Sequence, residues 1–115
     1  MNKYWMIVCA AAVFAGAAPV FAETVTGEVV DLGCYLDHGA KGEKHQKCAM
    51  NCIKGGMPVG VLTDDGKVYL VIGQHHKPAN DQLADLAAKK VTIEGKVGTQ
   101  NGVSIIVAEK IEPTK

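Results

Sequence analysis

Three cysteines and a histidine lie in one short stretch of this 115-residue chain, and their side chains are the ones best suited to chemistry. They are Cys34, His45, Cys48 and Cys52. Residues 43–54 contain no glycine or proline and are followed by a glycine pair, so we expect a helix there. On that helix, positions 45, 48 and 52 follow the spacing i, i+3, i+7. The sequence therefore predicts one imidazole and two sulfur atoms along a single helix face.

A metal site is the interpretation that this spacing favours. Cys34, which we place at the end of a strand, can supply a fourth ligand to the helix face, with His38 as an auxiliary or substitute ligand. A Cys₃His set holds Zn²⁺ tetrahedrally and also suits Cu(I), so we expect one such ion per chain. A filled four-ligand site has no open position for a substrate or an activated water. We therefore expect a metal-binding module with a structural or carrier role rather than an enzyme.

A disulfide is the alternative use of the same thiols. An oxidising compartment favours pairing, but three cysteines cannot all pair within one chain. Cys48 and Cys52 are one helical turn apart, at roughly 5–6 Å between Cβ atoms, which favours a bond from Cys34 to either of them. The alternative function is a thiol–disulfide redox protein, in which one of these cysteines would have a lowered pKa. The sequence leaves both functions open.

Other polar and sulfur-containing residues have weaker claims to the site. Asp31 precedes the first cysteine of the cluster and either orients a metal ligand or makes a local turn bond. We expect the adjacent His75 and His76 to be solvated rather than auxiliary ligands. Met50 and Met57 flank the cluster, and we favour core packing over copper binding for both.

The first residues have the pattern of a signal peptide. Lys3 supplies a positive charge, residues 4–18 are apolar, and Pro19 precedes a stretch that suits signal peptidase, so we expect cleavage after Ala22. The apolar run is shorter than the roughly 20 residues that a membrane-spanning helix needs. We therefore expect a periplasmic or secreted protein with no stable membrane anchor after cleavage. Cys9 lies in this removed segment.

Residues 23–115 are long enough for a single domain with one modest core. Loss of Lys3 leaves the balance of charges slightly negative, and no stretch is densely basic. Nucleic acid is therefore not an expected partner. The partner that the sequence indicates is a metal ion, and it identifies no periplasmic protein partner.

The elements that must position the cluster are mostly strands. Runs rich in Val, Ile and Thr predict strands, Asp65–Gly66 predicts a hairpin turn, and Asn80 can cap a short helix. The expected strands cover residues 24–32, 59–63, 67–72, 91–97 and 103–111, the helix covers 80–88, and the Cys/His insertion covers 33–57. This order matches a five-stranded OB-like barrel (β-β-β-α-β-β) with a helical insertion between strands 1 and 2. An open meander or a small sandwich is the alternative.

The stretch G-E-V-V-D-L-G-C-Y and the later H-Q-K-C-A-M-N-C-I-K-G-G-M-P-V-G-V-L resemble a group of small exported bacterial proteins, largely uncharacterised, that have a Cys/His cluster. The resemblance spans residues 27–71. It implies an OB-like fold and no established activity. The matching positions are Asp31, Cys34, His45, Cys48, Cys52, Gly56 and Pro58.

Overall fold

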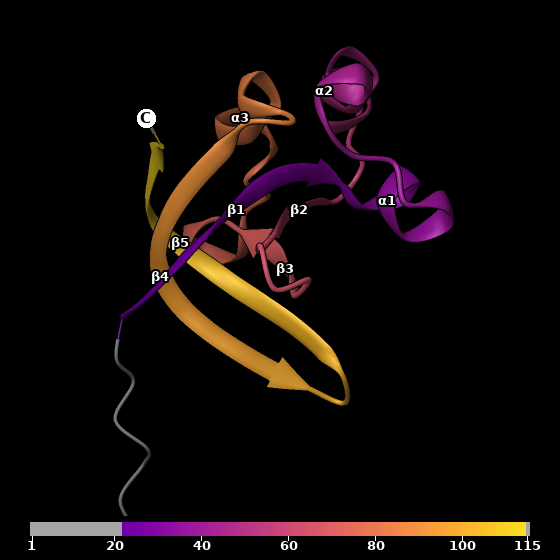
Figure 1. The fold of residues 1–115 in the computed structure, drawn as a ribbon. Coiled ribbons are helices and arrows are strands. Elements are labelled where there is room, and N and C mark those ends of the chain that lie inside the picture. Colours follow the sequence, from indigo (N-terminus) through magenta and orange to yellow (C-terminus); the bar gives the residue numbers. More distant parts are fainter. Residues whose placement is uncertain (1–21, 115) are drawn as a thin grey trace, which may run out of the picture.

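The computed structural model describes residues 22–114, so the expected signal peptide lies almost wholly outside the described part. The described chain is mostly β, with helices between strands (Figure 1). The strands are β1 Glu23–Asp31, β2 Val59–Leu62, β3 Val68–Ile72, β4 Lys90–Gln100 and β5 Val103–Pro113. The helical segments are α1 Leu32–His38, η1 Glu43–His45, α2 Gln46–Lys54, η2 Gln74–His76, α3 Asn80–Leu83 and η3 Ala84–Leu86. Across residues 22–114, no helix has the length and apolar character needed to cross a membrane.

The five strands form one sheet that closes into a ring, in the order β1-β2-β3-β5-β4 with β4 paired back to β1. Four of the five pairings are antiparallel, and β3 runs parallel to β5. The expectation of five strands is confirmed, and the alternative of an open meander is wrong. The closure leaves none of the five strands as a free edge over its full length.

The core fills the inside of this ring and one of its ends. Alternate residues of the strands point inward, as Val29, Ile93 and Ile106 do, and each is almost fully buried. Ile53 of α2 and Leu83 of α3 join the same core, and α2 packs against α3 and η3. Full burial of one such side chain contributes roughly 1.5–3 kcal/mol. Burial of Ile53 therefore fixes the helix that contains two of the cysteines.

A second, smaller apolar cluster fixes the beginning of the insertion. Val30, next along β1 from an inward-facing residue, packs with Leu32 of α1 and Leu62 of β2. Since neighbouring strand residues point to opposite faces, this cluster lies on the outer face of the sheet. It attaches α1 to the ring directly after β1.

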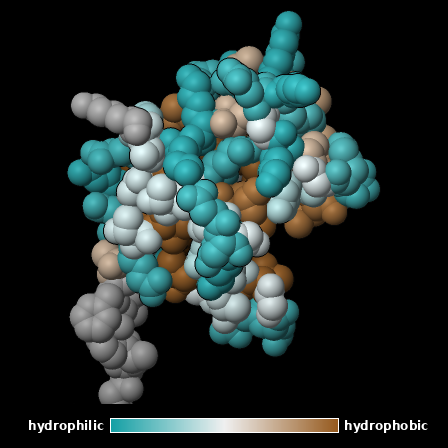
Figure 2. Space-filling model, in the orientation of Figure 1, coloured by the Kyte–Doolittle hydropathy of each residue, from teal (hydrophilic) through white to brown (hydrophobic). Residues whose placement is uncertain are grey.

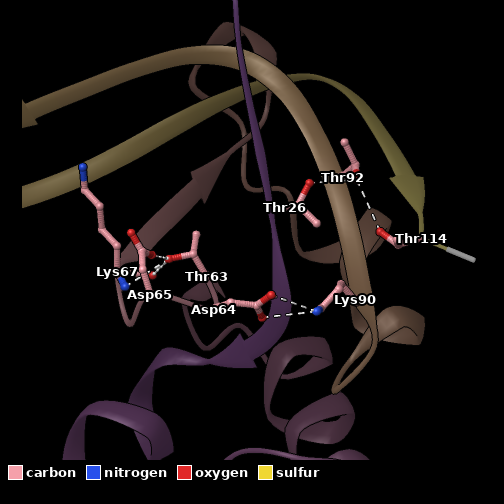
Figure 3. Close-up of polar contacts among 8 residues, drawn as sticks. All are labelled: Thr26, Thr63, Asp64, Asp65, Lys67, Lys90, Thr92 and Thr114. Atoms are coloured by element: carbon pink, nitrogen blue, oxygen red, sulfur yellow. Dashed lines mark hydrogen bonds and ion pairs between the residues drawn. The ribbon is translucent and has the colours of Figure 1, made fainter.

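Polar contacts close the turns and join strands around the ring (Figure 3). In the β2–β3 turn, Thr63 bonds to Asp65 and to the backbone of Lys67, as expected for the predicted hairpin. Lys90 Nζ lies 3.2 Å from Asp64 Oδ1. At β4, Gly95 forms a bulge where any Cβ atom would collide with the carbonyl of Val107.

Two segments differ from expectation. Within the insertion a helix was expected only over residues 43–54, but a further helix, α1, begins directly after β1. Asp31 caps that helix by accepting a hydrogen bond from the Gly33 N–H at 2.9 Å. Gly39, at φ 72°, ends it and donates its N–H to the Tyr35 carbonyl. The capping Asp and the terminal Gly explain where this short helix begins and ends.

The helix expected over residues 80–88 is shorter, and its predicted cap is wrong. Asn80 is the first helical residue of α3, and the chain continues from Ala84 as the 3-10 turn η3. The Asn80 side-chain amide instead donates to the carbonyls of Ile53 at 2.8 Å and Met57 at 2.7 Å. It thereby joins α3 to the end of α2.

Candidate metal site

Asp31 is a buried charged residue at the junction of β1 and α1, with 1% of its surface exposed. Its Oδ1 atom accepts the capping hydrogen bond from Gly33. Its Oδ2 atom is buried and has no hydrogen-bond partner. A buried carboxylate oxygen without a partner is costly, so this position favours a cation or a proton donor beside it.

Cys34 and His45 meet Asp31. One ligand atom from each of the three residues lies within 4.8 Å of those of the other two. Cys34 lies one helical turn after Asp31, and His45 is the last residue of η1. The Nε2 atom of His45 is also buried without a hydrogen-bond partner. In a tetrahedral zinc site, ligand atoms are separated by roughly 3.3–3.8 Å, so small side-chain movements bring these three atoms to ligand spacing.

Cys48 and Cys52 of α2 lie beside this group rather than in it. Cys52 is partly buried, Cys48 is exposed, and both sulfurs are outside the set of atoms within 4.8 Å. Burial first, and then the nearby Asp31 carboxylate and Cys48 thiol, raise the pKa of Cys52. Of the four predicted ligands, the structure thus brings Cys34 and His45 into one group and leaves the two cysteines of α2 adjacent to it.

The predicted single helix over residues 43–54 is divided into two segments. Glu43–His45 is a 3-10 turn, and the α-helix starts only at Gln46. His45 groups with Asp31 and Cys34, and Cys48 and Cys52 lie outside that group. His45 lies at the helix start, where its side chain is directed to the end of β1 and the start of α1.

The acidic neighbour makes these thiols hard to ionise. Interaction of the protonated thiol with Asp31, followed by burial, raises the pKa of Cys34 to about 11. The pKa of Cys52 is also raised, first by burial and then by Asp31. A redox cysteine needs a lowered pKa, and these two shifts have the opposite direction. A bound cation would oppose them by stabilising the thiolates.

All three cysteines of residues 22–114 are free thiols. The predicted alternative of a disulfide from Cys34 to Cys48 or Cys52 is therefore not present in this structure. Together with Asp31 and His45, the free thiols give five neighbouring side chains that can donate to a metal.

The histidines outside the group occupy other positions. His38 is exposed, and its Nδ1 atom lies 3.1 Å from Asp37 Oδ2. Its ring centroid is 6.5 Å from that of His45, so it neighbours the group without joining it. His75 and His76 are exposed in η2 and both have positive φ angles. Neither belongs to the Asp31 group, in agreement with the expectation of solvated side chains.

The methionines divide between core and surface. Met50 packs against the main core, as expected. Met57 is 39% exposed, so the expectation of core packing is wrong there.

Contacts from outside the insertion hold the ligand-bearing segments. Glu28 of β1 accepts a hydrogen bond from the Gly42 N–H at 2.8 Å, immediately before η1. Asn80 holds the end of α2 through the two carbonyl contacts described above. The loop before His45 is therefore held to β1, and the end of the helix with Cys52 is held to α3.

Asp31 is the candidate ligand that sequence reasoning did not assign. Its two expected roles, a turn bond and a contact to a ligand, are both present, since its Oδ1 atom caps α1 and its carboxylate lies within the group of Cys34 and His45. The useful signal was the spacing D-x-x-C, which puts aspartate and cysteine one turn apart if a helix starts at the aspartate.

Comparisons of this chain with protein-family models, curated proteins and solved structures found no match. The assignment of a function therefore depends on the chemistry of these side chains.

Proposed function

We propose that this chain is an exported metal-binding module that holds one Zn²⁺ ion through Asp31, Cys34, His45 and Cys52. The observation that supports this proposal most directly is the pair of buried atoms without partners, Asp31 Oδ2 and His45 Nε2. Both atoms belong to residues of the group that includes Cys34. An ion between them would satisfy both atoms at once.

Zinc is favoured over copper(I) by the carboxylate. Cu(I) prefers soft sulfur ligands, whereas Zn²⁺ accepts sulfur, imidazole and carboxylate together. The predicted Cys₃His set suited either ion. Replacement of one thiolate by Asp31 in the set makes zinc the better match.

Cys52 is the best fourth ligand among the neighbouring side chains. It is partly buried, the Asp31 carboxylate is near enough to contribute to its raised pKa, and α2 is anchored through the buried Ile53. A change of the Cys52 χ1 rotamer can move its sulfur toward the group without moving the helix. The proposed set thus differs from the predicted one by using Asp31 in place of Cys48.

A metal role is favoured over the thiol redox alternative. The raised pKa values of Cys34 and Cys52 keep both thiols protonated and weakly nucleophilic without a metal. The redox function also gives no role to the buried His45 nitrogen or to the Asp31 oxygen. Four filled ligand positions favour a structural or carrier role over catalysis.

Export and an OB-like fold complete the proposal. The amino-terminal pattern around Lys3 and Ala22 supports a cleaved signal peptide and a periplasmic or secreted location. The closed five-stranded ring, with a helix between β3 and β4, supports the OB-like interpretation. The site would then lie on the connection between the first two strands.

The test is the metal content of the protein expressed from its full sequence and purified without chelator or added metal. We expect about one zinc per chain and an intact mass that matches a chain beginning at Glu23. The thiols should react only after the protein is denatured in the presence of a chelator. Replacement of zinc by Co²⁺ should give sulfur-to-metal charge-transfer absorption. His38→Asn is a matched control for His45→Asn, and only the second variant should lose zinc. A metal-free protein with one reactive thiol would instead support a disulfide and the redox function.

A further inference from the structure

The proposed site has one more donor than zinc needs, and this inference depends on that proposed function. Five side chains that can bind zinc are neighbours: Asp31, Cys34, His45, Cys48 and Cys52. A zinc ion in a protein is almost always four-coordinate when its ligands are all side chains. One donor therefore remains outside a filled site.

Position distinguishes the surplus donor from the others. Asp31 is buried, Cys34, His45 and Cys52 are partly buried, and Cys48 is exposed. Cys48 lies one turn before Cys52 on α2, so the two side chains are neighbours on the helix surface. The surface of the molecule on the side of α2 is largely hydrophilic (Figure 2). Cys48 thus lies between solvent and the partly buried Cys52, where an ion would enter or leave the site.

We propose that Cys48 is the exchange ligand through which this domain passes zinc to an external thiolate or chelator. As the ion leaves, the bond from zinc to the Cys48 sulfur forms and the bond to the Cys52 sulfur breaks. The proton of Cys48 goes to water, and the Cys52 thiolate takes a proton from water. The oxidation state of zinc does not change, and the number of thiolates bound to it stays constant.

This arrangement matters because direct escape would strip the ion of all its ligands. A stepwise path replaces one bond by another and never leaves zinc without ligands. Cys48 can meet an incoming acceptor while its partner sulfur still holds the ion. The role of the site is then transfer of zinc rather than purely structural support.

The test follows zinc transfer from the zinc-loaded protein to an excess of a chromogenic chelator such as 4-(2-pyridylazo)resorcinol. The variants are Cys48→Ser and, as a matched control on the exposed side of the same helix, Asn51→Ser. We expect Cys48→Ser to keep one zinc per chain and a similar equilibrium affinity. Its transfer should slow about tenfold or more, which corresponds to about 1.4 kcal/mol in the barrier. Asn51→Ser should transfer zinc at the original rate.

The dependence of the zinc-transfer rate on chelator concentration gives a second measurement. The original protein should transfer zinc faster as the chelator concentration rises, whereas Cys48→Ser should show a weaker dependence because spontaneous release limits it. Equal rates in both proteins would overturn the inference. Loss of zinc from Cys48→Ser would make Cys48 a permanent ligand, which overturns the inference and leaves zinc binding intact. Absence of zinc from the original protein would refute the proposed function itself.

Discussion

The closed sheet and the insertion between β1 and β2 meet opposite requirements. In the sheet, inward-facing residues such as Val29, Ile93 and Ile106 are almost fully buried, and the ladders satisfy the backbone. In the insertion, the carboxylate of Asp31 and the ring of His45 each have a buried atom without a partner. The polar groups of the sheet are satisfied within the sheet, whereas the insertion keeps two buried polar atoms that a bound ion would satisfy.

This difference indicates that the sheet of this small protein supplies its stability, and that the insertion holds the candidate functional site. Apolar burial in the ring stabilises the fold, and this offsets the free-energy cost of burying polar side-chain atoms without hydrogen-bond partners. The two parts meet at Asp31, which ends β1 and caps α1. Mutations on either side of that residue should therefore separate folding from metal binding.

The largest expected effect comes from a substitution in the core of the sheet. Ile93→Ala should lower the free energy of unfolding by about 2–5 kcal/mol, because it opens a cavity in a fully buried position. The loss should be similar with and without zinc, as measured by urea unfolding.

His45→Asn is the contrasting change: it should abolish zinc binding and leave the metal-free stability nearly unchanged. A large loss of metal-free stability in His45→Asn would show that the insertion is not separable from the fold.

The next effect concerns pH and tests the insertion alone. Zinc binding must displace the protons of Cys34 and Cys52, whose pKa values are raised, that of Cys34 to about 11. Each displaced proton makes affinity rise about tenfold per pH unit, so two protons give about a hundredfold per unit between pH 7 and 9. Competition with a chelator of known affinity measures this slope. A slope near zero would mean that the thiols do not bind the ion.

The same shifts determine the stability of the metal-free protein. A thiol with a pKa raised above its unfolded value of 9.0 contributes stability that is present below pH 9. That contribution is lost as pH rises from about 9 toward 11, because the folded state then holds the proton more tightly than the unfolded state. Thermal unfolding of the metal-free protein should therefore show lower stability in this range. The zinc-bound protein, whose ligands are already thiolates, should not show this loss.

The smallest expected effect concerns Asp31, the residue that joins the sheet to the insertion. Asp31→Asn keeps an oxygen that can accept the capping hydrogen bond from Gly33, so the helix and the fold should persist. Loss of the negative charge should weaken zinc binding by about tenfold to a hundredfold. Isothermal titration calorimetry measures the affinity, and circular dichroism checks the helix. Unchanged affinity would restrict Asp31 to its capping role.

The strands could be predicted because their signals are local. Alternating apolar residues and the Asp65–Gly66 turn predict five strands close to the observed ones. Ring closure required pairing of β1 with β4, residues far apart in sequence, and no local pattern reports such a contact. The order of strands suggested it only through analogy with a known architecture.

The site was predicted in composition but not in geometry. Cys34 and His45 were correctly grouped, because residue type and proximity in sequence were enough. The single helix expected over residues 43–54 begins as the 3-10 turn η1, and His45 groups with Asp31 and Cys34 rather than with the cysteines of α2. Asp31 could not be assigned, since its burial depends on the helix that it caps and on packing around β1.

The parallel pairing of β3 with β5 has a consequence for how the chain folds. Leu70–Ile72 must wait for Ile105–Val107, which follow only after α3 and the whole of β4. Pairings that join distant segments form slowly. The residues from Asp31 to Cys52, by contrast, are close together in the chain and can meet early. Zinc held by the proposed site would then bind while the last strand is still free, and its supply would influence how much chain reaches the closed state.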